Sequence, residues 1–388
     1  MPNAHCHPIE LAQALIQCNS VTPAEGGALT LLESKLRPAG FSCHRLTMTE
    51  PGTPDVENLY ARLGTGAPHL CFAGHTDVVN AGDAAAWSHP PFGAVVEEGI
   101  LYGRGAVDMK GGIACFLAAA LGYLAEHGGL TRGSLSFLIT GDEESVAING
   151  TRKLLGWLRQ RQEQIDACLV GEPTSAERLG DEIKIGRRGY VNATVIVEGK
   201  QGHSAYGDKA VNPIPKLARI IDRLTTSVLD DGTEHFQKSS IEPTIISVPN
   251  TATNVIPGSA RANFNIRYND LHTRADIEAW VLKHCQAAAQ QLGVKFALAF
   301  EGSGDVFLTK PGQLTDMMAA AVTKITGRRP SLTTNGGTSD ARFIKDMCPV
   351  VEFGLRNGSA HHIDEHVPVA ELEMLTAIYR ELIATFFA

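Results

Sequence analysis

The stretch CFAGHTDVV, residues 71–79, is an apolar run that ends in two polar residues, His75 and Asp77. A short, continuous apolar run of this kind predicts a strand that is buried on both faces. Two later apolar runs end in acids in the same way: FLITGDEES (137–145) in Asp142, Glu143 and Glu144, and LVGEPTS (169–175) in Glu172. Ligands of open α/β sheets bind beyond the carboxyl ends of the strands, so these residues mark a candidate site.

Strands and helices alternate around these runs. Helical patterns at 110–127 and 151–164 separate the strands expected at about 70–79, 134–140 and 167–171. This alternation favours an α/β domain with a mostly parallel central sheet flanked by helices.

After residue 180 the pattern changes to strand, helix, strand, strand, helix, strand, with helices at about 213–229 and 273–292. This order is typical of a ferredoxin-like α+β module with one antiparallel sheet. The α/β pattern returns from about residue 304. We therefore expect a larger domain formed by residues 1–186 and 303–388, with an α+β domain of residues 187–302 inserted into it.

The composition argues against several classes of protein. The chain has 388 residues, a formal net charge of -8 and no cluster of Lys and Arg, which speaks against nucleic-acid binding. No apolar run approaches the roughly 20 residues of a membrane span, and MPNAHCHPIE does not resemble a signal peptide. The eight cysteines are scattered without a CxxC pair, so we expect free thiols in a reducing cytoplasm.

The residues at the strand ends are of the types that bind divalent metal ions. Asp108, in GRGAVDMKGG (103–112), adds a carboxylate just before the helix expected at 110. Together with a late histidine, the candidate ligands would number five: His75, Asp108, Glu144, Glu172 and one residue of NGSAHHIDEHV (357–367). A short carboxylate fixed at a turn, such as Asp108, is the best bridge between two ions. The pattern does not choose among His361, His362 and His366.

Each of these elements alone has an ordinary structural explanation. His75 and Asp77 could pair within a turn, adjacent acids are usually solvated, and Asp108 could cap the following helix. The HCH of residues 5–7 resembles a chelator but lies without partners near a chain end. The joint occurrence of candidate ligands at neighbouring strand ends favours the metal site.

Six motifs, in this order along the chain, resemble those of the dinuclear zinc aminoacylase and carboxypeptidase family: GHTDVV, GRGAVDMKGG, GDEES, GEPT, QGHSAY and NGSAHHIDEHV. The resemblance covers essentially the whole chain and implies hydrolysis of an amide bond by two zinc ions, with cobalt possible at either site. It assigns His75 and Glu172 to one ion, Glu144 and His361 to the other, and Asp108 to both. His362 stays open as a rival to His361.

The resemblance also implies roles around the ions. Glu143 would be the general base, Asp77 would orient His75, and the peptide bond from Asp108 to Met109 would be cis. The larger domain would be catalytic, and the inserted domain would serve as a lid and as the interface of a homodimer. His203 of QGHSAY would then reach the metal centre of the partner subunit and donate to the oxyanion.

Within the family, IGRRGY (185–190), NGGTSDARFI (335–344) and AHHIDEHV (360–367) most resemble members that remove the succinyl group from N-succinyl-L,L-diaminopimelate in lysine biosynthesis. A small substrate with several carboxylates favours recognition by arginine. The implied substrate contacts are Arg187, Tyr206, Asn254, Arg267, Gly336 and Thr338. Arg188 is expected to be an exposed strand charge. Gly207 and Asp208 stand where these members tend to have Pro and His, so this loop is expected to meet the substrate differently.

Two alternatives use the same fold. Deacetylation of N-acetylornithine, or cleavage of a dipeptide, would keep every metal ligand and change the arginines and loops. A non-catalytic metal-binding scaffold would keep the ligands without turnover, and the presence of Glu143 speaks against it.

Overall fold

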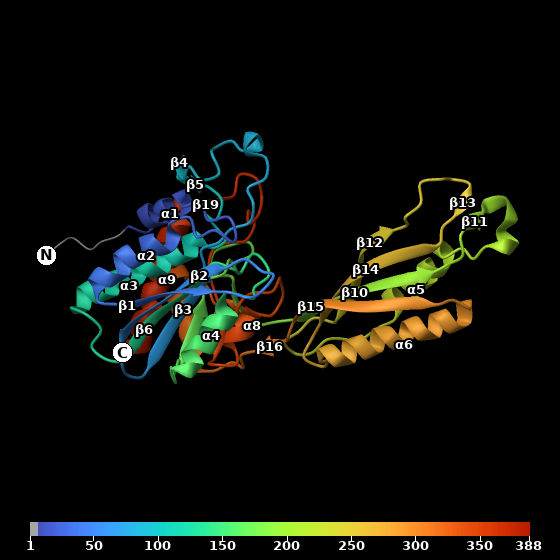
Figure 1. The fold of residues 1–388 in the computed structure, drawn as a ribbon. Coiled ribbons are helices and arrows are strands. Elements are labelled where there is room, and N and C mark those ends of the chain that lie inside the picture. Colours follow the sequence, from blue (N-terminus) through green and yellow to red (C-terminus); the bar gives the residue numbers. More distant parts are fainter. Residues whose placement is uncertain (1–6) are drawn as a thin grey trace. The chain divides into compact units, whose positions relative to one another are not determined.

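The structure is a computed structural model that describes residues 7–388, and it divides into two compact units (Figure 1). Unit 1 takes in the described residues up to Ile185 together with Thr309–Thr333 and Ser339–Ala388. Unit 2 consists of Gly186–Leu308 and Thr334–Thr338. Two residues of the HCH stretch at 5–7, His5 and Cys6, lie outside the described residues.

An eight-stranded sheet forms the centre of unit 1, and its middle strands β6, β3, β7 and β18 are parallel to one another (Figure 1). All residues of β3 and β6 are buried, as expected for strands covered on both faces. This confirms the predicted α/β fold with a mostly parallel sheet. In sheet order the strands are β1 (Ser42–Met48), β2 (Val56–Gly64), β6 (Ser134–Thr140), β3 (His69–His75), β7 (Ala167–Val170), β18 (Val350–Glu352), β8 (Glu182–Lys184) and β17 (Ser331–Thr333).

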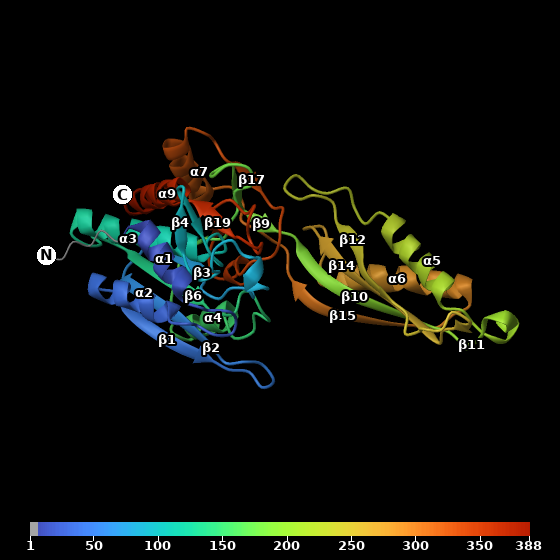
Figure 2. The same cartoon turned by 90° about the horizontal axis from the view of Figure 1, so that it is seen from above.

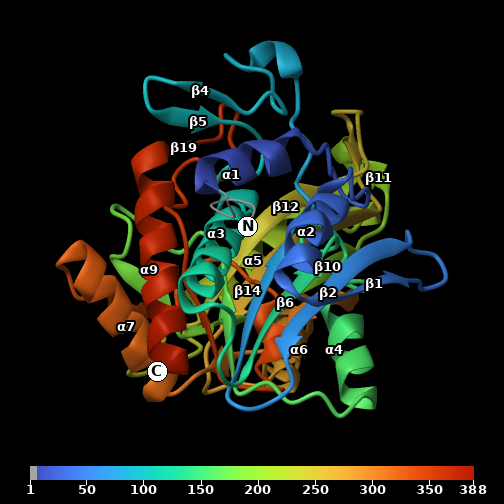
Figure 3. The ribbon, with the colours of Figure 1, turned by 90° about the vertical axis from the view of Figure 1, so that its left-hand side faces the viewer.

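Helices cover both faces of this sheet (Figure 3). On one face α3 (Lys110–His127) packs against α1 (Pro8–Gln17) and α9 (Val369–Phe387), with α2 (Ala28–Leu36) beside α1 and α7 (Gln313–Thr326) beside α9. On the other face α4 (Thr151–Gln160) packs against α8 (Ala341–Ile344). The remaining elements of unit 1 are a small sheet of β4 (Val95–Glu97), β5 (Ile100–Tyr102) and β19 (His366–Pro368) and the 3-10 helices η1 (Arg37–Ala39) and η2 (Ala84–Ala86).

One helix differs from the sequence-based expectation. The helix expected to run to residue 164 ends at Gln160, because Gln162 adopts a left-handed conformation with φ of 56° that breaks the helical path. The segment 182–184, just before the predicted domain boundary at 186, forms β8 of the large sheet, where it pairs with β17 and β18.

Unit 2 is an antiparallel sheet in the order β12, β14, β10, β15 with two helices packed on it (Figure 2). Burial alternates along β10, and Val191 and Val195 pack with Phe264 of β14 and Val281 of α6. The element order confirms the ferredoxin-like module. Its main elements are β10 (Gly189–Glu198), α5 (Ile214–Thr226), β12 (Ser240–Ser247), β14 (Ser259–Tyr268), α6 (Arg274–Leu292) and β15 (Phe296–Gly304). Short pieces complete it: β9 (Gly186–Arg187) with β16 (Phe307–Leu308), β11 (Gly202–His203) with β13 (Val255–Ile256), and the 3-10 helix η3 (Ser204–Lys209).

No helix in the described part of the chain is both long and apolar enough to span a membrane. The cysteines from Cys18 onward are free thiols, as the scattered spacing predicted.

Candidate metal centre

The central strands of unit 1 bring the predicted side chains to one edge of the sheet. β3 ends at His75, β6 ends just before the acids that begin at Asp142, and β7 ends just before Glu172. Because β3 is parallel to both β6 and β7, the carboxyl ends of the three strands lie side by side. Asp108 joins this edge from the loop before α3, and its peptide bond to Met109 is cis, as the resemblance implies.

The carboxylate of Asp108 lies between two imidazoles. Its Oδ1 is 3.1 Å from Nε2 of His75, and its Oδ2 is 3.3 Å from Nε2 of His361. His361 Nε2 also lies 2.7 Å from Oε1 of Glu144. One carboxylate thus presents each of its oxygens to a different histidine, which is the arrangement expected of a bridging ligand.

Glu143 and Glu172 complete the cluster. The carboxylate of Glu172 is 3.8 Å from Nε2 of His75. Donor atoms of His75, Asp108 and Glu144 lie within 4.8 Å of one another, and so do donor atoms of His75, Glu143 and Glu172. The cluster therefore holds more carboxylates than imidazoles, and nitrogen and oxygen donors at this spacing fit divalent metal ions.

The electrostatics reflect the crowding of these acids. Burial first, and then the charges of neighbouring acids, raise the pKa of Glu143 and of Glu172 well above the ordinary value. Burial would also raise the pKa of Asp108, but hydrogen bonds with His361 and His75 lower it well below the ordinary value. Hydrogen bonds with Asp108 and Glu144 raise the pKa of His361 to about 10. In the cluster itself the positive charge comes from imidazolium protons, whose place a divalent cation would take.

Asp77 acts on the site through the backbone. Nδ1 of His75 lies 2.9 Å from the carbonyl oxygen of Asp77, and since a carbonyl only accepts, Nδ1 carries the proton and Nε2 faces the acids. The Asp77 carboxylate, expected to bind this N–H, is 3.7 Å away. It accepts instead from the backbone N–H groups of Glu143, at 3.3 Å, and Glu144, at 3.0 Å. Asp77 therefore holds both the ring and the segment that carries the two acids.

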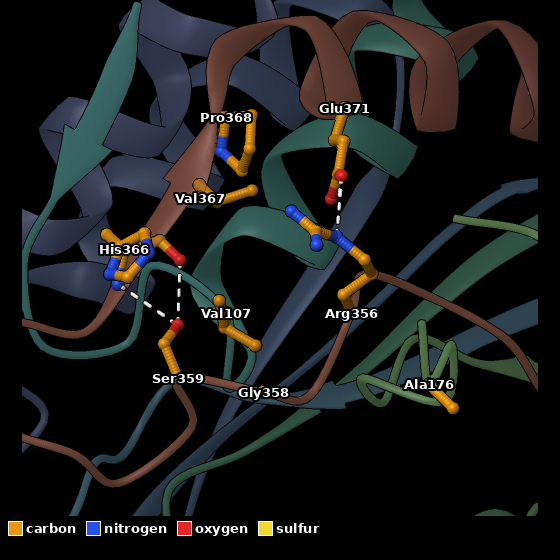
Figure 4. A pocket seen from close by; sticks show the side chains of 9 residues that line it. All are labelled: Val107, Ala176, Arg356, Gly358, Ser359, His366, Val367, Pro368 and Glu371. Carbon is orange, nitrogen blue, oxygen red and sulfur yellow. Dashed lines mark hydrogen bonds and ion pairs between the residues drawn. The ribbon is translucent and has the colours of Figure 1, made fainter. Parts of the chain in front are cut away.

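Only one of the three late histidines lies against the described acids of this cluster. His361 contacts Asp108 and Glu144, whereas the His366 ring is tilted against that of Tyr102, with the ring centroids 5.6 Å apart. Figure 4 shows His366 beside Ser359 in a small separate cavity, where the Ser359 hydroxyl donates to the His366 carbonyl at 2.7 Å. The backbone of His362 donates to the Ser359 carbonyl at 3.1 Å, and its side chain is exposed.

The predicted substrate residues of unit 2 fall into two groups. In the first, Nη1 of Arg187 donates to the carbonyl of Asn335 at 2.9 Å, and Nη1 of Arg267 donates to Oγ1 of Thr338 at 3.2 Å. Gly336 lies in the same group with a left-handed φ of 97°. Burial, and then the charge of Arg188, lower the pKa of Arg267. Crowded guanidinium groups of this kind favour an anionic ligand.

The second group lies at the other end of β10. His203 on β11 pairs with Val255 of β13, its Nδ1 accepts from the backbone N–H of Ala205 at 3.1 Å, and its ring lies 5.6 Å from that of Tyr206. The carbonyl of Asn254 accepts from the N–H of Ser204 at 2.9 Å. β10 has ten residues, so the two groups are separated by roughly 30 Å at about 3.3 Å per residue.

Two buried acids beside the cluster escaped the sequence analysis. Asp340 is 5% exposed, and its Oδ1 has no hydrogen-bond partner among the described residues. Glu365 is fully buried and binds the loop that carries Asp108. Asp340 lies in NGGTSDARFI and Glu365 in NGSAHHIDEHV, so a carboxylate inside a motif already singled out was the available signal.

Comparisons with known proteins identify the family of this chain. The profile of Peptidase family M20/M25/M40 matches residues 71–385. A succinyl-diaminopimelate desuccinylase of Rhodopseudomonas palustris is 56% identical over 382 residues, which cover 98% of each chain. Among solved structures, an M20 family metallo-carboxypeptidase of Sulfolobus solfataricus matches with a TM-score of 0.77 at 16% identity, covering 98% of this chain and 99% of that one. A dinuclear metal-binding peptidase of the M20 family from Bacillus subtilis matches with a TM-score of 0.68 at 15% identity over 98% of both chains.

Proposed function

Since the chain belongs to Peptidase family M20/M25/M40, we propose that it is a metal-dependent amide hydrolase that converts N-succinyl-L,L-diaminopimelate to succinate and L,L-diaminopimelate. The observation that carries the reaction class is the Asp108 carboxylate placed between His75 and His361 in a cluster of acids. The substrate follows from the 56% identity to a relative named for that reaction. A role in lysine and diaminopimelate biosynthesis follows from the same substrate.

Two divalent ions fit the donor set. We assign His75 and Glu172 to one ion, Glu144 and His361 to the other, and Asp108 to both, because these contacts divide the donors between the two oxygens of Asp108. Imidazole and carboxylate ligands suit zinc, and cobalt accepts the same set. When bound, the ions supply a water of lowered pKa and polarise the amide carbonyl.

The chain's own residues then move the proton. Glu143 takes a proton from the attacking water and returns it to the leaving amine as the amide bond breaks, which needs a carboxyl group with a raised pKa. Asp77 holds this acid in place by accepting hydrogen bonds from the backbone N–H groups of Glu143 and Glu144. His75 is held in the required tautomer by the Asp77 carbonyl.

The substrate's carboxylates are the proposed ligands of the first group of unit 2, called here the arginine group because it contains Arg187 and Arg267. Arg187 and Arg267 offer planar forks that match a carboxylate with two hydrogen bonds, and Thr338 and Gly336 line the same group. Arg188 adds positive charge nearby, since it lowers the pKa of Arg267.

A homodimer would bring the second group to a partner's site. One copy of unit 2 separates His203, Tyr206 and Asn254 from the arginine group by roughly 30 Å, too far for one small substrate to contact both. We propose that the second group serves the partner's metal centre, with His203 donating to the oxyanion. The edge strand β12 carries exposed Ile245 and Ile246 and offers the pairing surface. The cytoplasm is the proposed compartment, because the described cysteines are free thiols.

A turnover assay tests the proposed reaction. Purified protein with added zinc is compared on N-succinyl-L,L-diaminopimelate and N-acetylornithine, and we expect kcat/KM to be about 100-fold or more in favour of the succinylated substrate. A preference for N-acetylornithine would mean that the enzyme removes a different acyl group, as in the first alternative within the family. Absence of turnover on any amide, with metal bound, would support a scaffold.

A further inference from the structure

Glu365 is a buried carboxylate whose two oxygens both bind the loop that carries Asp108. Its Oε2 accepts from Nη1 of Arg104 at 2.7 Å and from the N–H of Gly105 at 3.0 Å. Its Oε1 accepts from the N–H of Val107 at 2.9 Å and from that of Asp108 at 3.1 Å. A fully buried carboxylate with four donors leaves little freedom to the backbone it holds. The position of Asp108 therefore depends on Glu365.

Arg104 extends this contact to the loop of His361. Its side chain is buried, its Nη1 binds Glu365, and its Nη2 donates to the backbone carbonyl of His361 at 3.3 Å. The guanidinium also lies over the ring of Trp87 at 5.2 Å, which limits its movement. One planar group thus connects Glu365 with the backbone of His361.

His361 depends on such support more than the other histidine of the cluster does. His75 ends a buried strand, whereas the His361 side chain is 48% exposed on an irregular loop. Its backbone φ of 63° is left-handed, a conformation that residues other than glycine keep only where their surroundings hold it. The hydrogen bond from Arg104 is one of the contacts that hold it.

We propose that Glu365 and Arg104 are positioning residues that set the distance between Asp108 and His361 and thereby the affinity for a divalent ion bound by both. Neither residue contacts the reacting groups. The inference rests on the metal centre of the proposed function. It predicts different effects for the two residues: Glu365 orders the ligand shared by both ions, and Arg104 supports a ligand of only one.

The test is a titration of metal-free protein with Co²⁺. Binding is measured by calorimetry and by the visible absorption of the bound cobalt. Arg104→Lys keeps the charge beside Glu365 but loses the fork that reaches His361. We expect one of the two dissociation constants to rise about 10- to 100-fold and the other to stay within about threefold. The matched control is Arg62→Lys on β2, the same change in a partly buried ion pair with Glu163, and it should leave both dissociation constants unchanged.

Glu365→Gln is the second variant. An amide keeps the shape but places a donor group opposite N–H donors, so it disturbs Asp108 directly. We expect both dissociation constants to rise about 10-fold or more, since Asp108 is assigned to both ions. In a His361→Ala background, Arg104→Lys should have no further effect on the remaining ion.

The melting temperature of each metal-free variant separates positioning from folding. The proposal requires weakened binding in variants that remain folded, and Arg104→Gln replaces Arg104→Lys if the latter does not fold. The proposal would be overturned if both dissociation constants were unchanged in folded Arg104→Lys, or if Arg62→Lys lost as much metal affinity as Arg104→Lys. Uptake of a single ion by wild-type protein would overturn it together with the dinuclear centre. Wild-type protein that binds two ions but ignores the succinylated substrate would refute the proposed substrate alone.

Discussion

At the scale of single residues, Glu143 and Glu144 are adjacent acids with different neighbours. Glu144 contacts His361, whereas Glu143 lies near His75 and Glu172. We expect Glu143→Ala to bind about two metal ions and to lose turnover by roughly 100-fold or more, because a positioned base is removed. Glu144→Ala should lower the metal content itself. Metal analysis and kcat of both variants check this pair.

Removal of the metal is the companion experiment. Dialysis of wild-type protein against a chelator should abolish turnover, and zinc or cobalt should restore it. Near wild-type kcat in Glu143→Ala would mean that another group takes the proton.

Gly336 limits the space around Arg187, which is a proposed substrate contact in unit 2. A Cβ at this position would lie 2.4 Å from Nη1 of Arg187, and the φ of 97° is unfavourable for any other residue. We expect Gly336→Ala to displace the Arg187 guanidinium and to raise KM for the succinylated substrate by about 10-fold or more. Gly337→Ala is the matched control, because a Cβ there meets no atom within 4 Å of the described structure. Equal KM values for the two variants would show that Arg187 does not bind the substrate.

At the scale of elements, Asp230 joins two connections of unit 2. It lies between α5 and β12, and its Oδ1 accepts from the N–H groups of Gly232 at 2.9 Å and Ser239 at 3.1 Å and from the side chain of Asn269 at 2.6 Å. His272 lies 3.0 Å from its Oδ2. Burial would raise the pKa of Asp230, but these hydrogen bonds lower it to about 2.

The lowered pKa makes the contribution of Asp230 depend on pH. Since the folded pKa is below the unfolded value of about 3.9, the stabilisation is complete above that value and is lost as the pH falls toward about 2. We expect Asp230→Asn to lower the free energy of unfolding by about 1–3 kcal/mol at pH 7. The difference in melting temperature from wild type should shrink between about pH 4 and pH 2. The control is Asp231→Asn, a change at the exposed neighbouring residue. A difference in melting temperature between Asp230→Asn and wild type that stays constant with pH would contradict the role of the charge.

At the scale of the whole molecule, the proposed homodimer gives the two residue groups of unit 2 roles in different active sites. If His203 acts in the partner's site, mixing inactive Glu143→Ala and His203→Ala chains under subunit exchange should restore activity. A mixed dimer has one site with Glu143 and the other chain's His203 intact. Random exchange should therefore give about a quarter of wild-type turnover.

The exchange itself is followed with differently tagged chains, which pull each other down only in mixed dimers. Mixed dimers without activity would place His203 in its own subunit's site or outside the reaction. Unexchanged mixtures of the same two chains serve as the baseline.

Local sequence determined much of this molecule. Continuous apolar runs predicted β3 and β6, and helical periodicity predicted α3 over the residues at which it is found, 110–127. The polar residues at the strand ends predicted the gathering of His75, Glu144 and Glu172, because parallel strands end at one edge of a sheet, and Asp108 joins them from the loop before α3. These features follow from side-chain patterns that repeat over a few residues.

Tertiary structure alone decided which groups meet across long stretches of chain. The choice of His361 over His362 and His366 depends on a loop with left-handed φ angles at His361 and Asp364. The carboxylate of Asp77 accepts hydrogen bonds from the backbone N–H groups of Glu143 and Glu144, not from His75. Arg104 and Glu365 are 261 residues apart in sequence, and no local pattern pairs them. Such contacts depend on how loops are packed after the sheet has formed, since a loop's path is set by the surfaces it covers and not by its own periodicity.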